Sequence, residues 1–180
     1  MKATGIVRRI DDLGRVVIPK EIRRTMRIRE GDPLEIFTNA DGEVIFKKYS
    51  PMAELGAFAG EYCDVLAKTG NLPAIVTDKD YVIAAAGTPK KELLERRISP
   101  ELEEIMETRQ AYAYSPEEGK RIQPVEGIEK TAVLAAPILS AGDIVGSVLF
   151  LSPDASYAPT DADRKLLMAA SMFLGKHMES

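Results

Sequence analysis

The chain has 180 residues, of which 45% are apolar and 29% charged, and its formal net charge is -4 at pH 7. Its single cysteine, Cys63, excludes an intramolecular disulfide, and no run approaches the roughly 20 apolar residues of a membrane span. Residues 1–50 carry 11 Lys and Arg against 8 Asp and Glu, a net of +3, whereas the rest carries 13 against 20, a net of -7. This shift predicts two domains, at 1–50 and 56–180, with a short linker at 51–55. The single cysteine and the lack of a long apolar run predict a cytoplasmic protein.

The chain begins with a predicted β-hairpin. Residues 4–10 and 15–18 have strand character, and the turn between them, Asp-Asp-Leu-Gly at 11–14, ends on the permissive Gly14. Pro19 cannot donate to a strand ladder but suits the first turn of a helix, so a helix is expected to begin there.

The predicted helix has one apolar and one cationic face. At about 100° per residue, Ile22 and Met26 fall on one side. The opposite side carries Lys20, Arg23, Arg24 and Arg27. Four cations on so short a helix repel one another, and a polyanion would offset that repulsion.

A second hairpin is predicted from residues 33–38 and 43–49, joined at the strong turn signal Asp41-Gly42. Apolar residues occur on both faces of these strands, as at Ile36 and Phe37. About 50 residues make a marginal core, so we expect an obligate dimer that covers both faces.

Residues 1–49 closely resemble the AbrB-type transition-state regulator DNA-binding domain. The resemblance rests on 4–10, on Leu-Gly-Arg-Val-Val-Ile-Pro at 13–19, on 21–24 and on 31–36. It implies a swapped-hairpin β-barrel formed by two chains, with double-stranded DNA as the partner.

The same resemblance assigns the site residues. It places DNA-contacting arginines at Arg8, Arg15, Arg23 and Arg24, and Arg9, Lys20 and Arg27 are expected to be phosphate-positioning charges. Arginine suits this work because its planar fork holds a phosphate or a guanine edge bidentately. A lone arginine is usually just a solvated side chain, so the inference depends on the whole set. No recognition helix of ordinary length is apparent, so readout is expected to combine phosphate contacts with DNA shape.

The second half has an α+β order, which begins with an amphipathic helix at 52–68. The further predicted elements are a hairpin at 73–78 and 81–86, helices at 90–97 and 100–109, a strand at 111–115, a polar loop at 116–129, a hairpin at 131–139 and 143–151, and a last helix capped by Thr160.

Residues 56–178 resemble a GAF domain, through Ala-Ala-Pro-Ile at 135–138, the run at 146–151 and the helix at 161–176. The resemblance implies an antiparallel sheet flanked by helices, whose first and last helices pair with another copy to give a tetramer. It also implies a site for a small effector between the sheet and residues 90–129. No residue set names a ligand, no cofactor is expected, and the motif of cyclic-nucleotide-binding GAF domains is not apparent.

Catalytic chemistry is not expected. His177, the only histidine, lies near the end of the chain, and Cys63 fits core or interface packing better than catalysis. The acids Glu101, Glu103, Glu104 and Glu107 fit a solvated helix face. No cysteine, histidine and carboxylate group has metal-ligand spacing.

The sequence is therefore interpreted as a DNA-binding transcription regulator, an activator and/or a repressor, whose second domain oligomerises it and is a candidate to bind a small effector. The resemblance further implies control of sporulation genes, at the nucleoid of the forespore. The alternative is an antitoxin-type interaction module, since the swapped barrel also occurs in antitoxins, although those usually continue into a disordered tail. An enzyme is disfavoured because no nucleophile and base are paired.

Overall fold

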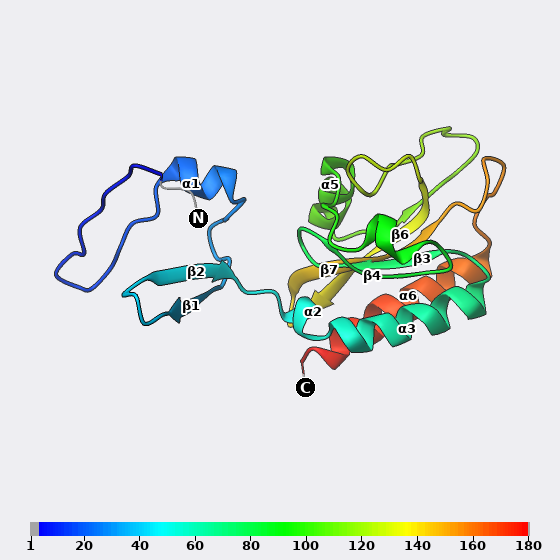
Figure 1. Cartoon of the computed structure of the whole chain (residues 1–180). Helices are drawn as coiled ribbons and strands as arrows, with labels where there is room; N and C mark the ends of the chain where they lie inside the picture. The colour runs from blue at the N-terminus through cyan, green and yellow to red at the C-terminus, as the bar shows by residue number, and fades with distance from the viewer. Residues whose placement is uncertain (1–3, 180) are drawn as a thin grey trace. The chain divides into compact units, whose positions relative to one another are not determined.

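The computed structural model describes residues 4–179 (Figure 1). The chain divides into two compact units, Met1–Tyr49 and Ser50–Ser180. Within residues 4–179, no helix is both long enough and apolar enough to cross a bilayer. Helices and antiparallel sheets occur together, which confirms the predicted α+β class.

Residues 4–49 of the N-terminal unit form one helix, α1 (Lys20–Thr25), and one hairpin, made of β1 (Leu34–Thr38) and β2 (Val44–Lys48). The strands pair antiparallel with Ile36 opposite Phe46. At the turn, the Asn39 side-chain oxygen accepts hydrogen bonds from the N–H groups of Asp41 and Glu43, at 3.1 and 2.9 Å. The predicted helix and second hairpin are thereby confirmed.

The first predicted hairpin is only partly present. Its turn exists, because the Gly14 N–H donates to the Asp11 carbonyl at 3.0 Å and Gly14 has a φ of 75°. Residues 4–10 and 15–18, however, form no strand in this chain. A strand needs a partner along its length, and the Asp11 N–H to Arg15 carbonyl bond at 3.1 Å supplies only one link.

The described part of this unit, residues 4–49, has almost no core, because Pro19 is its only buried residue. Even α1 buries no side chain. Large apolar residues are exposed throughout, namely Ile6, Val7, Ile10, Leu13, Val16, Val17, Met26, Ile36, Phe37, Val44, Phe46 and Tyr49.

The second unit is built on a five-stranded antiparallel sheet of order β4-β3-β7-β6-β5. The strands are β3 (Ala74–Thr77), β4 (Val82–Ala86), β5 (Tyr112–Ala113), β6 (Ala132–Ser140) and β7 (Asp143–Leu151). β6 and β7 form the central hairpin, which was predicted at 131–139 and 143–151. The antiparallel sheet expected for the second half is thus confirmed.

Helices cover both faces of this sheet (Figure 1). The long helices α3 (Gly56–Gly70) and α6 (Asp161–His177) lie on one face, where Leu66, Leu167 and Leu174 are buried with Phe150. On the other face, α4 (Lys90–Leu93) and α5 (Pro100–Thr108) bury residues such as Leu93 and Leu102.

Two local predictions differ from the structure. The helix expected over 90–97 ends at Leu93, because the following residues run beside β4, where the Glu95 N–H donates to the Val82 carbonyl at 3.0 Å. The segment expected as a linker, 51–55, holds the short helix α2 (Pro51–Glu54), and its Met52 side chain is fully buried in the second unit. The predicted cap of α6 is present as a capping box between Thr160 and Asp163.

Candidate nucleic-acid interface

Arg15 is positioned by an aspartate that organises the turn before it. The Asp11 carboxylate accepts hydrogen bonds from the N–H groups of Leu13 and Arg15, at 3.0 and 2.8 Å, and from Arg15 Nε at 2.8 Å. The Arg15 N–H, followed by the Arg15 guanidinium, lowers the pKa of Asp11 below its ordinary value. The Arg15 side chain nevertheless remains 69% exposed, so it is oriented without being buried.

Arg8 and Arg9 lie on the extended segment before this turn, and both are exposed. Lys20, Arg23 and Arg24 are exposed on α1, with the two arginines in its last turn, where the helix dipole favours cations. None of these five side chains makes a hydrogen bond or ion pair with a residue between 4 and 179. Their charges are therefore available to an external anion.

Arg27 does not belong to the cationic helix face on which it was predicted. α1 ends at Thr25, and Arg27 has a left-handed φ of 49°. The Ile28 N–H donates to the Arg23 carbonyl at 2.7 Å and the Arg27 N–H to the Arg24 carbonyl at 3.2 Å, which is the Schellman pattern of a helix end. Arg27 is half-buried beyond this end, so the helical face consists of Lys20, Arg23 and Arg24.

The structure also identifies residues that hold α1 against the hairpin, which the sequence analysis did not single out. Lys48 on β2 donates to the Arg27 carbonyl at 3.0 Å and lies 3.6 Å from an Asp32 carboxylate oxygen. The same Asp32 oxygen accepts the Arg29 N–H at 2.9 Å. Asp32 and Asp11 share a recognisable signal, because aspartate commonly hydrogen-bonds nearby backbone N–H groups at turns.

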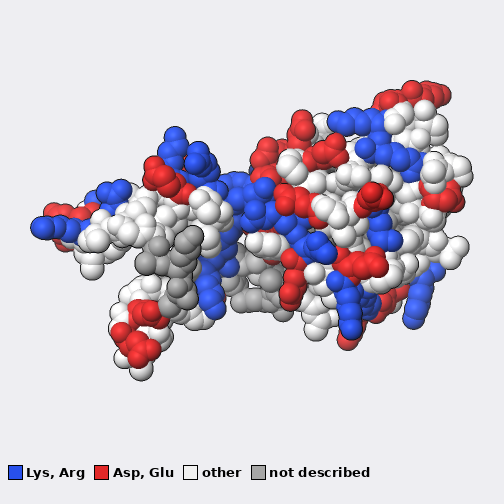
Figure 2. Space-filling view, turned by 45° about the horizontal axis from the view of Figure 1, so that its top comes forward, with Lys and Arg blue, Asp and Glu red and all other residues white. Residues whose placement is uncertain are grey.

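Basic side chains stand out from the surface with acidic ones between them (Figure 2). Despite these acidic side chains, residues 1–50 carry a net charge of +3. A surface of this kind attracts a polyanion through a few well-placed cations rather than through a large uniform field.

The second unit brings no catalytic set together among its described residues. His177 stacks on Phe58 with ring centroids 4.3 Å apart, and Cys63 is buried with its thiol 3.2 Å from the Ala74 carbonyl. The core packing predicted for Cys63 is confirmed. Glu101, Glu104 and Glu107 are exposed as predicted, whereas Glu103 is half-buried. No three His, Cys, Asp or Glu side chains of residues 4–179 cluster as metal ligands would.

Two family models match the chain. Residues 54–179 match the model described as stage V sporulation protein T C-terminal, transcription factor. Residues 7–53 match the model described as antidote-toxin recognition MazE, bacterial antitoxin.

Individual relatives agree with this division. The chain is 49% identical to stage V sporulation protein T of Bacillus subtilis (strain 168), over 99% of each chain. It is 61% identical to the transition state regulatory protein AbrB of the same organism over 51 residues, 28% of this chain and 52% of that protein. The solution structure of the AbrB N-terminal DNA recognition domain matches 28% of this chain and 94% of its own, at 61% identity and a TM-score of 0.25.

A GAF domain, that of the nutrient sensor CodY from Clostridium difficile, matches 66% of this chain and 83% of its own, at 14% identity and a TM-score of 0.44. The family itself is established by the two more extensive sequence matches. One family model covers well over half of the chain, and a relative aligned over its whole length shares about half of its residues. The chain therefore belongs to the stage V sporulation protein T family of transcription factors.

Proposed function

We propose that this chain regulates the transcription of sporulation genes by binding double-stranded DNA through Arg8, Arg15, Arg23 and Arg24. The observation that carries the proposal is a set of exposed cations, of which Arg8, Arg23 and Arg24 have no acidic partner within residues 4–179, on an N-terminal unit whose sequence is 61% identical to AbrB. Arg15 differs from the rest because Asp11 holds it in place. Binding to DNA releases counterions in proportion to the phosphates that such cations neutralise.

The DNA-binding form is a dimer. Residues 4–49 bury only Pro19 and leave the apolar side chains of both hairpins exposed. A second copy would cover these side chains and give residues 4–10 and 15–18 the strand partners that they lack in one chain. Pairing also doubles the number of arginines presented to the duplex, which compensates for the modest charge of each copy.

The second unit joins such dimers into a tetramer through α3 and α6. Phe58, Tyr62, Phe173 and His177 form a continuous stack across the two helices, with Tyr62 and Phe173 centroids 5.2 Å apart. Phe173 is still 48% exposed and Val65 59% exposed, so the stack extends to the surface. Replacing Phe173 by Glu is expected to convert tetramers to dimers in sedimentation velocity.

The proposed place of action is the cytoplasm of the forespore, at the nucleoid, and the proposed role is regulatory rather than catalytic. Membership of a transcription factor family supports the absence of an enzymatic role. A small effector bound in the second unit would then act on DNA affinity.

A toxin-binding role is the second candidate, because residues 7–53 match the MazE antitoxin model. The same arginines would then face an acidic protein rather than DNA. The continuation into a complete second unit that matches a transcription factor family favours the DNA role.

The test is DNA affinity over a salt series, with random and promoter-derived duplexes. Arg23→Ala/Arg24→Ala removes four cations from a dimer, so the slope of log affinity against log salt should become shallower by about 3 to 4. The matched control, Arg96→Ala/Lys165→Ala, removes two exposed cations per chain from the second unit and should leave the slope unchanged. Weak, sequence-blind binding that ignores Arg23 and Arg24 would refute the proposal.

A further inference from the structure

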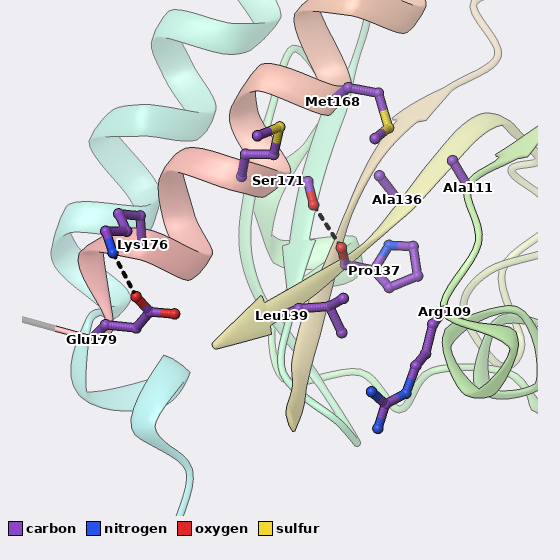
Figure 3. Close-up of a pocket in the computed structure, with 10 residues that line it drawn as sticks. Arg109, Ala111, Ala136, Pro137, Leu139, Met168, Ser171, Lys176 and Glu179 are labelled. Carbon is purple, nitrogen blue, oxygen red and sulfur yellow. Dashed lines mark hydrogen bonds and ion pairs between the residues drawn. The ribbon is translucent and has the colours of Figure 1, made fainter. Parts of the chain in front are cut away.

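A cavity of about 280 Å³ lies at one edge of the sheet in the second unit (Figure 3). Its walls come from β6, from α6 and from residues 109–111, which follow α5. It lies beyond the end of the short strand β5: Tyr112 and Ala113 pair with Ala135 and Leu134, and past Ala135 the outer edge of β6 has no strand beside it within residues 4–179.

Most of the cavity wall is apolar, and its side chains are exposed in the single chain. Met168 is 43% exposed, Met172 71% exposed and Leu139 39% exposed. An added strand is disfavoured here, since Pro137 has no N–H to offer and its carbonyl already accepts the Ser171 hydroxyl at 2.5 Å. Methionine adapts its shape to small apolar groups, so the wall suits a hydrocarbon body.

The charged groups at the rim leave one cation without an acidic partner. Lys176 Nζ is paired with a Glu179 carboxylate oxygen at 2.9 Å. Arg109 donates from one guanidinium nitrogen to the Gly142 carbonyl at 2.9 Å, and no carboxylate of residues 4–179 forms an ion pair with it. A guanidinium carries five donors, so most of its capacity remains for a ligand.

The backbone of Arg109 sets where its side chain leaves the end of α5. Arg109 caps the C-terminus of α5 with a left-handed φ of 59°. Gly or Asn is favoured at such a position, and a long side chain there is disfavoured. Arginine at this point places a guanidinium at the rim of the cavity, where glycine would serve the turn better.

We propose that this cavity binds a small monocarboxylate with a short hydrocarbon body. The carboxylate lies on Arg109, and the body lies against Met168, Met172 and Leu139. A volume of about 280 Å³ holds on the order of nine water-sized groups, which corresponds to a six-carbon acid. The site is separate from the effector site expected between the sheet and residues 90–129, and it does not depend on the DNA-binding proposal.

The experiment titrates the full chain, labelled with carbon-13 at its methionine methyl groups, with hexanoate. The Met168 and Met172 signals should shift with a Kd on the order of 1 mM, whereas the fully buried Met52 should not respond. Hexylamine has the same chain and the opposite charge, and it should bind at least about tenfold more weakly.

Arg109→Gly tests the role of the guanidinium in binding without destabilising the fold. Glycine accepts the left-handed backbone, so the melting temperature should hold or rise while hexanoate affinity falls at least about tenfold. Glu95→Gly is the matched backbone control, because Glu95 is exposed with a φ of 61° and does not line the cavity. Arg96→Ala is the charge control, and both controls should bind hexanoate normally.

Three results would overturn the proposal. Hexanoate and hexylamine could shift the same signals equally, which would leave Arg109 without a role in recognition. Arg109→Gly could bind hexanoate as the parent does. Hexanoate could produce no shift while Met172→Glu alters the sedimentation coefficient, in which case this face is an interface between copies.

Discussion

Replacing Gly175 by Ala tests how closely α6 must approach the sheet. A Cβ at Gly175 would lie 2.0 Å from the Leu139 carbonyl oxygen, whereas real contacts stay beyond 3.0 Å. The helix would have to retreat by ~1 Å, and overpacking of this kind costs up to about 3 kcal/mol. Alanine has a helix propensity about 1 kcal/mol more favourable than that of glycine, so the free energy of unfolding is expected to fall by about 2 kcal/mol.

Gly60→Ala is the matched control. Gly60 also lies within a helix, α3, but a Cβ there would meet no atom within 4 Å. It is therefore expected to stabilise the protein by about 0.5–1 kcal/mol. The chain has no tryptophan, so urea unfolding should be followed by far-UV circular dichroism. The close packing of α6 on β6 would be refuted if Gly175→Ala were as stable as Gly60→Ala.

Three further predictions concern a titrating cap, a buried thiol and a strained turn. Burial raises the pKa of Asp163, but hydrogen bonds from Thr160 and Tyr157 outweigh it and lower that pKa overall. The resulting stabilisation is present above about pH 4 and is lost as pH falls through the lower folded-state pKa. Asp163→Asn should therefore be about 1 kcal/mol less stable in urea at pH 7, with the difference from the parent narrowing in acid. Burial, with a smaller effect of the Asp64 carboxylate, raises the pKa of the Cys63 thiol to about 12. A thiol-reactive dye should therefore label Cys63 only after unfolding. Rapid labelling of the native protein would contradict its burial. Gly14→Ala should weaken DNA binding in the salt series, because the turn at Gly14 positions Arg15 and a backbone φ of 75° costs alanine about 1 kcal/mol. Unchanged DNA affinity would show that DNA binding does not depend on this turn.

Much of the fold was predictable because its signals are local. Asp41-Gly42 marks the turn between β1 and β2, and Thr160 with Asp163 marks the start of α6. The two apolar runs at 131–139 and 143–151 likewise identified the central hairpin of β6 and β7. Each of these signals lies within a few residues of the element that it specifies.

The errors occurred where the structure depends on distant partners. Residues 4–10 have strand composition but no strand beside them in one chain. The sequence after Leu93 predicts a helix, whereas in the structure this segment lies beside β4 and forms hydrogen bonds with the Val82 backbone. The sequence alone does not indicate where such long-range pairings fall.

The candidate site shows the same division. The cationic face at Lys20, Arg23 and Arg24 followed from helical spacing and is found on α1. The prediction that Arg27 lies on that face was wrong, because an arginine in the sequence does not indicate that its backbone adopts a left-handed conformation. The cavity beside Arg109 was not predicted, since it depends on the length of β5 and on the approach of α6.

The geometry of the N-terminal unit links its folding to its charge. α1 has six residues and buries none of them, and so short a helix is unstable in water without packing. By helical spacing, Ile22 lies on the side of α1 away from Arg23 and Arg24, and the exposed Met26 follows the helix as its C-cap residue. A partner chain that covers Ile22 would therefore leave Arg23 and Arg24 facing outward. On the proposed pairing, the contact that stabilises the helix is therefore also the contact that fixes the arginines in space. A substitution in this apolar surface should then weaken dimer formation and DNA affinity together, because both depend on the same surface.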